Sequence, residues 1–541
     1  MRLLPFLISL SLFASATSIA AREDAEQDSS RGVEIVPYIE AQQVVSMQLS
    51  PGDDVVTWTQ LAAGVDAGIS GRNSEASVSL RYERVIGYGE IADSDTITGI
   101  ARGSVAVVPR TLTFEAGALA TRTEVDGLGA STPGLFATNA SSSSQLYSVY
   151  AGPTLQAAVG RMALTSAYRI GYTRVESPDI TVAEPDSRRD DLFDESVSHS
   201  FAARAGFAPG EVLPAGVGIG VGWNRQDISN FDQRIDEKYV RADVTFPVSP
   251  TVAIVGGVGA ERVEVSSRDV LRDGEGAPVI GADGQYTLDT GKPRQIAYET
   301  EGLIWDVGVM WRPSRRTSLE AYVGHRYGAT TYHGTFGYAP SANSSFNLSV
   351  YHNITSFGGV LADALADLST NFTAFRNPVS GDLTGCVTSL EGGNCALARL
   401  GPVRSSVFRN RGITASYGRK MGRTSLGLGA GYDRREYIAP DDSVLSAANG
   451  VIDQNYWVTA GASRQLDRQS GLSLSATATW LDSGFVDEDG SFGYSASLGY
   501  YRDLLVGLSA TAAIGLDGIT RDSLPDYTNA SALAGLRYTF R

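Results

Sequence analysis

The chain has 541 residues, and its 44 Lys and Arg against 60 Asp and Glu give a formal net charge of −16. An acidic chain lacks the basic surface that phosphate recognition needs, so no nucleic-acid partner is expected. The hydrophobic share of 43%, with 9% aromatic residues, excludes an intrinsically disordered chain.

Residues 1–20 have the pattern of a secretory signal peptide. Arg2 supplies the positive charge, residues 3–13 are mostly apolar, and Ala20 ends a stretch suited to cleavage. The alternative is a membrane anchor, but the apolar run is short for a bilayer-spanning helix of about 20 residues. Residues 21–32 form a polar periplasmic lead-in. Because only this segment precedes the first expected strand, a TonB-dependent receptor with an N-terminal plug domain is not expected.

From Val33 onward, apolar residues alternate with Gly, Ser, Thr and scattered charge. Leu472 and Leu474, for example, alternate with Ser473 and Ser475. This period of two predicts strands with one apolar face. The strands extend over about a dozen residues, and roughly 9–11 are enough for a tilted strand to cross a bilayer. Aromatic residues near the strand ends predict interfacial girdles, formed by Trp305, Trp311, Tyr432, Tyr437, Trp457, Trp480 and Tyr500.

Short and long connections alternate along this series. The predicted strands begin near residues 33, 55, 75, 96, 111, 145, 162, 196, 213, 235, 251, 297, 317, 331, 345, 405, 424, 454, 471, 491, 504 and 527. The short turns include 70–73, 247–250, 313–316, 418–423, 466–471 and 502–503, and the long loops include 125–144, 176–195, 265–295, 355–403 and 439–453. Short periplasmic turns and long outer loops are typical of outer-membrane barrels. The sequence therefore predicts an all-β fold, a single transmembrane antiparallel up-and-down β-barrel of about 22 strands over residues 33–541.

The last strand carries a resemblance to a known class. Residues 535–540 (GLRYTF) are similar to the C-terminal signal of outer-membrane barrels, with Gly535, Tyr538 and Phe540 in the places of its glycine and aromatic residues, although Arg541 follows. With the blocks 423–437 and 344–351, residues 33–541 resemble the beta-barrel-porin-2-like proteins of Gram-negative exopolysaccharide gene clusters. The resemblance implies an outer-membrane location, insertion by the barrel-assembly machinery, contact with lipid and lipopolysaccharide, and polysaccharide export components as partners.

Charge is distributed unevenly over the predicted barrel. The outer loops are acidic, and the periplasmic turns carry a basic rim of Arg312, Arg315, Arg316, Arg419, Lys420 and Arg423. The alternation of side chains along the strands places charged residues of both signs in the lumen, at Arg169, Arg204, Arg241, Asp243, Glu261, Asp306, Glu320, Arg326, Asp433, Arg435 and Arg537. One interpretation is solvated rims and structural ion pairs. The other is a conduit whose basic inner mouth gathers an anionic polymer.

The longest loop, residues 355–403, contains two further features. Cys386 and Cys395 lie close together in a secreted chain, which predicts a local disulfide. Leu361, Leu365 and Leu368 share one helical face. They predict a short helix that either constricts the pore or caps it from outside.

No catalytic motif is present in the sequence. Signatures of zinc peptidases, serine hydrolases and P-loop proteins are missing, and His199 and His333 have no serine–acid partners that the sequence identifies. We therefore expect no enzyme, no metal site and no cofactor. The predicted function is an outer-membrane channel or conduit linked to exopolysaccharide export or surface assembly. The alternatives are a structural or adhesion barrel that transports nothing and a general diffusion porin.

Overall fold

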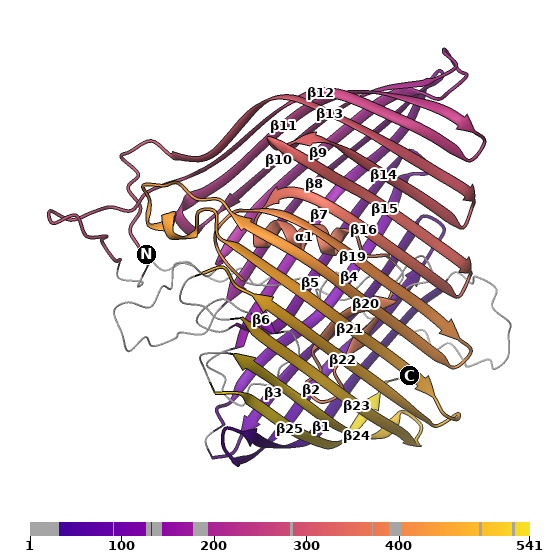
Figure 1. Ribbon diagram of the computed structural model, residues 1–541. Helices are drawn as coiled ribbons and strands as arrows, with labels where there is room; N and C mark the ends of the chain where they lie inside the picture. The colour runs from indigo at the N-terminus through magenta and orange to yellow at the C-terminus, as the bar shows by residue number, and fades with distance from the viewer. Residues whose placement is uncertain are drawn as a thin grey trace.

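A closed ring of antiparallel strands accounts for most of the chain in the computed structural model (Figure 1). The structure describes residues 32–89, 91–125, 131–132, 143–176, 193–281, 285–370, 372–388, 403–485, 490–521 and 525–540. The predicted signal peptide 1–20, the lead-in up to residue 31 and Cys395 of the predicted disulfide lie outside these residues. Within them, no helix is long and apolar enough to cross a membrane.

The ring has 22 strands. They are β1 (Gly32–Ser50), β2 (Val55–Ser70), β3 (Ser74–Gly87), β4 (Ser94–Val108), β5 (Leu112–Val125), β7 (Ser143–Val159), β8 (Met162–Glu176), β9 (Glu195–Phe207), β10 (Gly216–Ile228), β11 (Gln233–Ser249), β12 (Val252–Ser267), β13 (Gln295–Ser314), β14 (Thr317–Arg326), β15 (Ala329–Ser341), β16 (Ser344–Thr355), β19 (Phe408–Met421), β20 (Thr424–Tyr437), β21 (Ile452–Gln465), β22 (Ser470–Asp482), β23 (Ser491–Leu505), β24 (Leu508–Arg521) and β25 (Tyr527–Thr539). Each pairs with its neighbour, and β25 closes the ring on β1.

The predicted strand series is confirmed, with one turn misplaced. Every strand begins within a few residues of its predicted start, and the largest difference is at β24, which begins at Leu508 rather than near residue 504. The turn predicted at Arg502 and Asp503 is wrong, because β23 continues to Leu505 and the chain reverses at Val506 and Gly507. Gly507 has φ +78°, a left-handed conformation that glycine adopts without strain.

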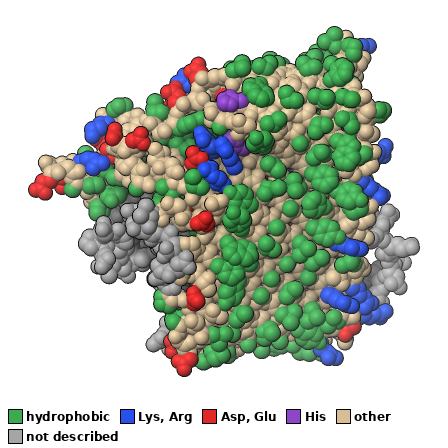
Figure 2. All heavy atoms as spheres, viewed as in Figure 1, with side chains coloured by type: hydrophobic (Ala, Val, Ile, Leu, Met, Phe, Trp, Pro, Cys, Tyr) green, Lys and Arg blue, Asp and Glu red, His purple; other side chains and the backbone are tan. Residues whose placement is uncertain are grey.

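The outer face of the wall is apolar. On β13, Leu303, Trp305 and Val307 are 65%, 46% and 50% exposed, and similar side chains cover the strands in Figure 2. Among the predicted girdle residues, Tyr437 and Trp457 are instead buried. Both lie on the inner face of their strands, because side chains alternate between the two faces. Trp457 lies between Tyr456 and Val458, which face outward, and Tyr437 has the same parity as the buried Arg435.

The long loops contain smaller elements. They are β6 (Ser131–Thr132), which pairs with β5, the helical turns η3 (Asn230–Asp232) and η5 (Val444–Ala448), helix α1 (Phe357–Ala366), and the hairpin of β17 (Thr373–Arg376) and β18 (Leu383–Thr388). The helix predicted in the longest loop is therefore confirmed. It begins at Ser356, whose Oγ accepts a hydrogen bond from the Gly359 N–H at 3.2 Å.

A closed sheet with an apolar outside is suited to lipid, because no strand edge leaves its backbone groups without partners in hydrocarbon. The connections at one end of the barrel are all short, and every long loop lies at the other end (Figure 1). This is the architecture of Gram-negative outer-membrane barrels, with the short-turn end facing the periplasm. The protein is an outer-membrane β-barrel.

Candidate channel interior

One network of ion pairs extends along the inner wall from β9 to β13. Asp243 of β11, 5% exposed, accepts hydrogen bonds from Arg204 of β9 at 2.5 Å and from Arg241 at 3.1 Å. Arg241 in turn reaches Asp306 of β13 through two hydrogen bonds of 2.6 Å. A planar guanidinium suits such forked contacts and keeps its charge. Four of the predicted lumen charges are therefore brought together.

Glycines on the intervening strands leave room for these arginines. The Arg204 side chain passes over Gly218 of β10, where an added Cβ would lie 2.4 Å from Arg204 Nη2. Arg241 passes over Gly257 of β12, where an added Cβ would lie 2.2 Å from Arg241 Nη2. Part of the glycine content of the inner face thus allows ion pairs between strands that are not neighbours.

We expect Gly257→Ala to destabilise the barrel by about 1–2 kcal/mol, because the new methyl group would displace Arg241 from its charge-assisted hydrogen bonds to Asp306. Thermal unfolding of the purified barrel measures the effect. The matched control is Gly256→Ala, since an added Cβ at Gly256 meets nothing within 4 Å. Equal stability of the two variants would contradict the interpretation.

A second cluster of charged residues lies at the outer end of β14. Arg326 donates from Nε to Glu261 at 3.1 Å and from Nη2 to Glu237 of β11. Its guanidinium also stacks over the ring of Tyr239, 4.5 Å from the centroid. Glu320, at the other end of β14, pairs instead with Arg312 of the predicted basic rim.

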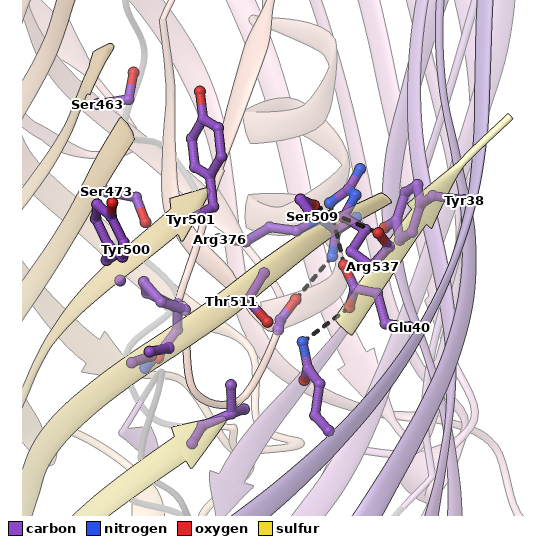
Figure 3. A pocket seen from close by; sticks show the side chains of 18 of the residues that line it. Tyr38, Glu40, Arg376, Ser463, Ser473, Tyr500, Tyr501, Ser509, Thr511 and Arg537 are labelled. Atoms are coloured by element: carbon purple, nitrogen blue, oxygen red, sulfur yellow. Dashed lines mark hydrogen bonds and ion pairs between the residues drawn. The ribbon is translucent and has the colours of Figure 1, made fainter. Parts of the chain in front are cut away.

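A third cluster lies at the seam where β25 meets β1 (Figure 3). Arg537 donates to Glu40 at 3.1 Å, and its guanidinium lies 3.7 Å from the ring centroid of Tyr38. Arg81 of β3 also pairs with Glu40 and, at 3.1 Å, with Glu83. Only Arg537 of this cluster was predicted. The other charged members follow the inward parity of their strands, so the same alternation could have identified them.

The ion pair of Asp433 and Arg435, on the inner face of β20, is almost completely buried. Both side chains are 1% exposed, and Arg435 Nε donates to Asp433 at 2.8 Å. Asp433 also accepts from Asn455 Nδ2 at 3.2 Å. The guanidinium faces the ring of Phe408 at 4.9 Å. If one member of such a buried ion pair is removed, the other member is left as an uncompensated buried charge.

Helix α1 lies inside the barrel, against the inner faces of β5, β7, β8 and β9 (Figure 1). Thr173 of β8 donates to the Gly358 carbonyl at 3.3 Å, and Arg169 lies 3.8 Å from Asp363. The helix follows β16, and β7 to β9 lie several strands away around the ring. The loop therefore folds into the lumen, as the constriction hypothesis requires, and does not form a purely external cap.

The loop continues across the lumen after the helix. Arg376 of β17 donates to the hydroxyls of Ser79 on β3 and Thr98 on β4, at 3.0 and 2.9 Å. Asp382 pairs with Arg122 of β5 at 2.9 Å. None of these contacts was predicted, because each joins residues more than 200 positions apart and no local pattern specifies the pairing.

An apolar cluster surrounds α1 in the outer part of the lumen. We call it the outer apolar cluster, and its members come from the inner wall and from the loop: Ile100, Leu119, Leu146, Tyr150, Val175, Phe193, Ile228, Ile235, Val263, Val265, Tyr327, Ile354, Phe357, Leu361, Leu365, Ala366, Leu368, Phe372, Leu383, Val403, Val407 and Ile438. Leu361 and Leu365 are fully buried. Burial of a leucine contributes about 1.5–3 kcal/mol, so the cluster holds the loop in place.

Two cavities lie on the periplasmic side of this cluster. One, of about 580 Å³, extends from the seam cluster to the segment 374–381 of the loop and includes Arg468 of a short turn (Figure 3). The other, of about 660 Å³, follows the network of Arg204 and Arg241 and includes Pro209 of a short turn. In the described part of the chain, these two cavities thus lie on the periplasmic side, and the outer apolar cluster lies beyond them.

The remaining predicted residues lie at the periphery. Arg315, Arg316, Arg419, Lys420 and Arg423 are exposed at the short-turn end, where Figure 2 shows basic side chains. Tyr538 and Phe540 face outward, with their rings 4.9 Å apart, and Gly535 lies in the β25–β1 pairing.

The two histidines that were considered for catalysis lie on opposite faces of the wall. His199 is on the outer face, with Nδ1 2.8 Å from Tyr168 Oη and its ring stacked on Trp223. His333 faces the lumen and stacks on Tyr322. The structure does not bring them together. The described residues contain no group of three or more His, Cys, Asp or Glu that could hold a metal ion.

No family model matches the sequence, and no curated protein matches it. Solved structures do match the fold. They include the FrpB iron transporter of Neisseria meningitidis (TM-score 0.44, 9% identity, 93% of this chain and 81% of that chain) and the ferric-catecholate import receptor Fiu of E. coli K12 (0.41, 10%, 93% and 81%). The siderophore receptor PiuA of Acinetobacter baumannii is also similar, with a TM-score of 0.41 and 9% identity over 93% of this chain and 82% of that chain. At these values the likeness says nothing about what this chain carries.

Proposed function

We propose that this protein is a gated outer-membrane conduit that is loaded from the periplasm. The observation that carries the proposal is the asymmetry of the lumen, in which polar cavities lie on the periplasmic side and the outer apolar cluster lies beyond them. A polar, charged lining suits a hydrated cargo. The loop that holds α1 is the segment that has to move for cargo to leave.

We propose further that the cargo is an exopolysaccharide, exported or assembled at the surface. The support is chemical. The cavity walls combine tyrosines with serine, glutamine and paired charges, which can contact a polymer of hydroxyl groups through hydrogen bonds and ring faces. The basic rim would concentrate an acidic polymer at the entrance. Exopolysaccharide-cluster barrels, which the sequence resembles, imply the same cargo.

This role requires no catalysis by the barrel, and we propose that the protein is not an enzyme. The competing roles are a structural or adhesion barrel and a general diffusion porin. A porin would conduct small ions steadily in a planar bilayer, whereas a structural barrel would not conduct even after the loop is removed. A gated conduit would conduct only after the loop is displaced.

Loss of the rim charges tests the export role. In cells that lack the chromosomal copy, we expect the variant Arg312→Gln, Arg315→Gln, Arg316→Gln to restore less secreted acidic glycan than the wild type, because the entrance no longer attracts an anionic polymer. Secreted uronic acid per cell is the measurement. Export of a neutral glycan by the same variant is the control. Full restoration of acidic glycan would count against the proposal.

A further inference from the structure

A group of arginines lies on the outer face of the wall, outside the lumen. Side chains alternate along β19 and β20 so that Ile413 and Tyr432 face outward. Arg409 and Arg411 of β19 have the same parity as Ile413, and Arg434 of β20 has the same parity as Tyr432. The three arginines, with His352 of β16, form what we call the outer-face cluster.

The aromatic residues beside the cluster place it relative to the membrane. Tyr432, Tyr456 and Trp480 are paired across β20, β21 and β22, and the rings of Tyr432 and Tyr456 are 4.8 Å apart. Rows of outward-facing aromatics mark the level where hydrocarbon meets headgroups. Arg434 and Arg411 lie two residues further toward the long loops, a rise of about 7 Å. The cluster is therefore at the level of the outer-leaflet headgroups.

The register brings like charges together. Arg411 and Arg434 are direct cross-strand partners, as are Arg409 and Glu436. Like charges directly opposite each other destabilise a strand pair. Glu436 is the shared carboxylate, at 2.9 Å from Arg434 and 3.6 Å from Arg409. Three guanidinium groups thus face one carboxylate.

The contacts of the arginines leave donors available. Arg411 Nε donates to His352 Nε2 at 3.1 Å, and no described carboxylate lies within ion-pair distance of Arg411. Arg409 is engaged elsewhere, because its guanidinium lies 5.4 Å from the ring centroid of Tyr298 and 3.6 Å from Glu436. Guanidinium donors in excess of carboxylates form a site for an external anion, and phosphate fits their forked geometry.

Two other outward-facing arginines each have more than one carboxylate partner. Arg262 of β12 lies within 4 Å of Glu264, Glu299 and Glu301. Arg84 of β3 pairs with two aspartates, at 2.9 and 2.6 Å. Unlike Arg411, these two arginines are therefore fully paired with carboxylates.

We propose that the outer-face cluster binds the phosphate group of a lipid headgroup in the outer leaflet. The phosphate lies between Arg411 and Arg434, where it relieves the repulsion of their direct pairing and accepts hydrogen bonds from both. Its position above the aromatic row commits the site to a membrane lipid, since the acyl chains then extend along the apolar wall. The proposal is independent of whether the barrel transports anything.

Lipid binding to the purified full-length barrel tests the proposal. The probes are a phosphate-bearing glycolipid and the same lipid after enzymatic dephosphorylation, each titrated into barrel in neutral detergent and followed by native mass spectrometry. We expect Arg411→Gln with Arg434→Gln to bind the phosphorylated lipid at least about ten-fold more weakly, because the charge-assisted hydrogen bonds of both guanidinium groups to the phosphate are lost. The dephosphorylated lipid should bind wild type and variant alike.

The control is Arg262→Gln, which removes one outward-facing positive charge that is already paired with glutamates and should leave binding unchanged. If the double variant fails to fold, the single variant Arg411→Gln replaces it. Binding by the double variant at wild-type strength would overturn the proposal, and so would equal weakening by Arg262→Gln. Displacement of the lipid by millimolar inorganic phosphate would show a site for free phosphate and overturn the assignment to lipid.

Discussion

Removal of residues 358–400 should raise the conductance of the barrel in planar bilayers several-fold. The deleted segment contains α1 except its first residue, the β17–β18 hairpin and most loop members of the outer apolar cluster, including Leu361 and Leu365. Without it, the lumen loses the loop that crosses it, while the wall keeps its continuous strand pairing through β16 and β19. Water and ions would then pass through a barrel of 22 strands.

The comparison needs a variant in which the loop stays but its packing fails. Leu361→Asp with Leu365→Asp places two carboxylates in the apolar cluster, where each would be buried without a partner. We expect frequent opening of this variant and rare opening of the wild type. Heat-modifiable mobility in gel electrophoresis checks that both variants are folded. Unchanged conductance of both folded variants would contradict the proposal that the loop is a gate.

Arg435→Ala should lower the free energy of unfolding by about 3–5 kcal/mol, the cost of removing one member of a buried ion pair. Asp433, which is 0% exposed, would keep its hydrogen bond from the Asn455 amide but lose its cation, and Phe408 would lose the guanidinium that faces its ring. Unfolding by guanidinium chloride in detergent measures the loss.

The control for Arg435→Ala is Arg262→Ala on the outer face, where the arginine side chain is 56% exposed. Exposed ion pairs contribute roughly 0–1 kcal/mol, so this variant should unfold almost as the wild type does. Similar losses for the two variants would mean that the ion pair of Asp433 and Arg435 is not specially important to stability.

Strand positions were predictable because apolar and small or polar residues alternate within each strand. Alternation in β13 identifies the outward face from Leu303 to Val307 without reference to any other strand, and lipid imposes that alternation throughout the ring. The turn at Gly507 was misplaced because alternation continues through it, and only a left-handed glycine marks the reversal. Tyr437 and Trp457 were assigned outward because an aromatic near a strand end has the same composition on either face.

The interior was predictable only in part. Parity placed Arg204, Arg241, Asp243 and Asp306 in the lumen, but not their order of pairing, which depends on register between strands. The helical periodicity of Leu361 and Leu365 predicted the helix but not whether it lies inside or outside the barrel. Contacts such as that between Asp382 and Arg122 come from the folding of a loop across a wide space, which no local pattern encodes.

The arginines that pass over glycines have a mechanical consequence for the wall. Arg204 and Arg241 connect β9 to β11 and β11 to β13, so each ion pair skips one strand. In β21 to β23, hydroxyl pairs such as Ser475 with Ser497, at 2.7 Å, join adjacent strands only. The arc from β9 to β13 is therefore cross-braced and stiff, and the circumference is more elastic in the arc from β21 to β23. A bulky cargo that stretches the bore would widen it there.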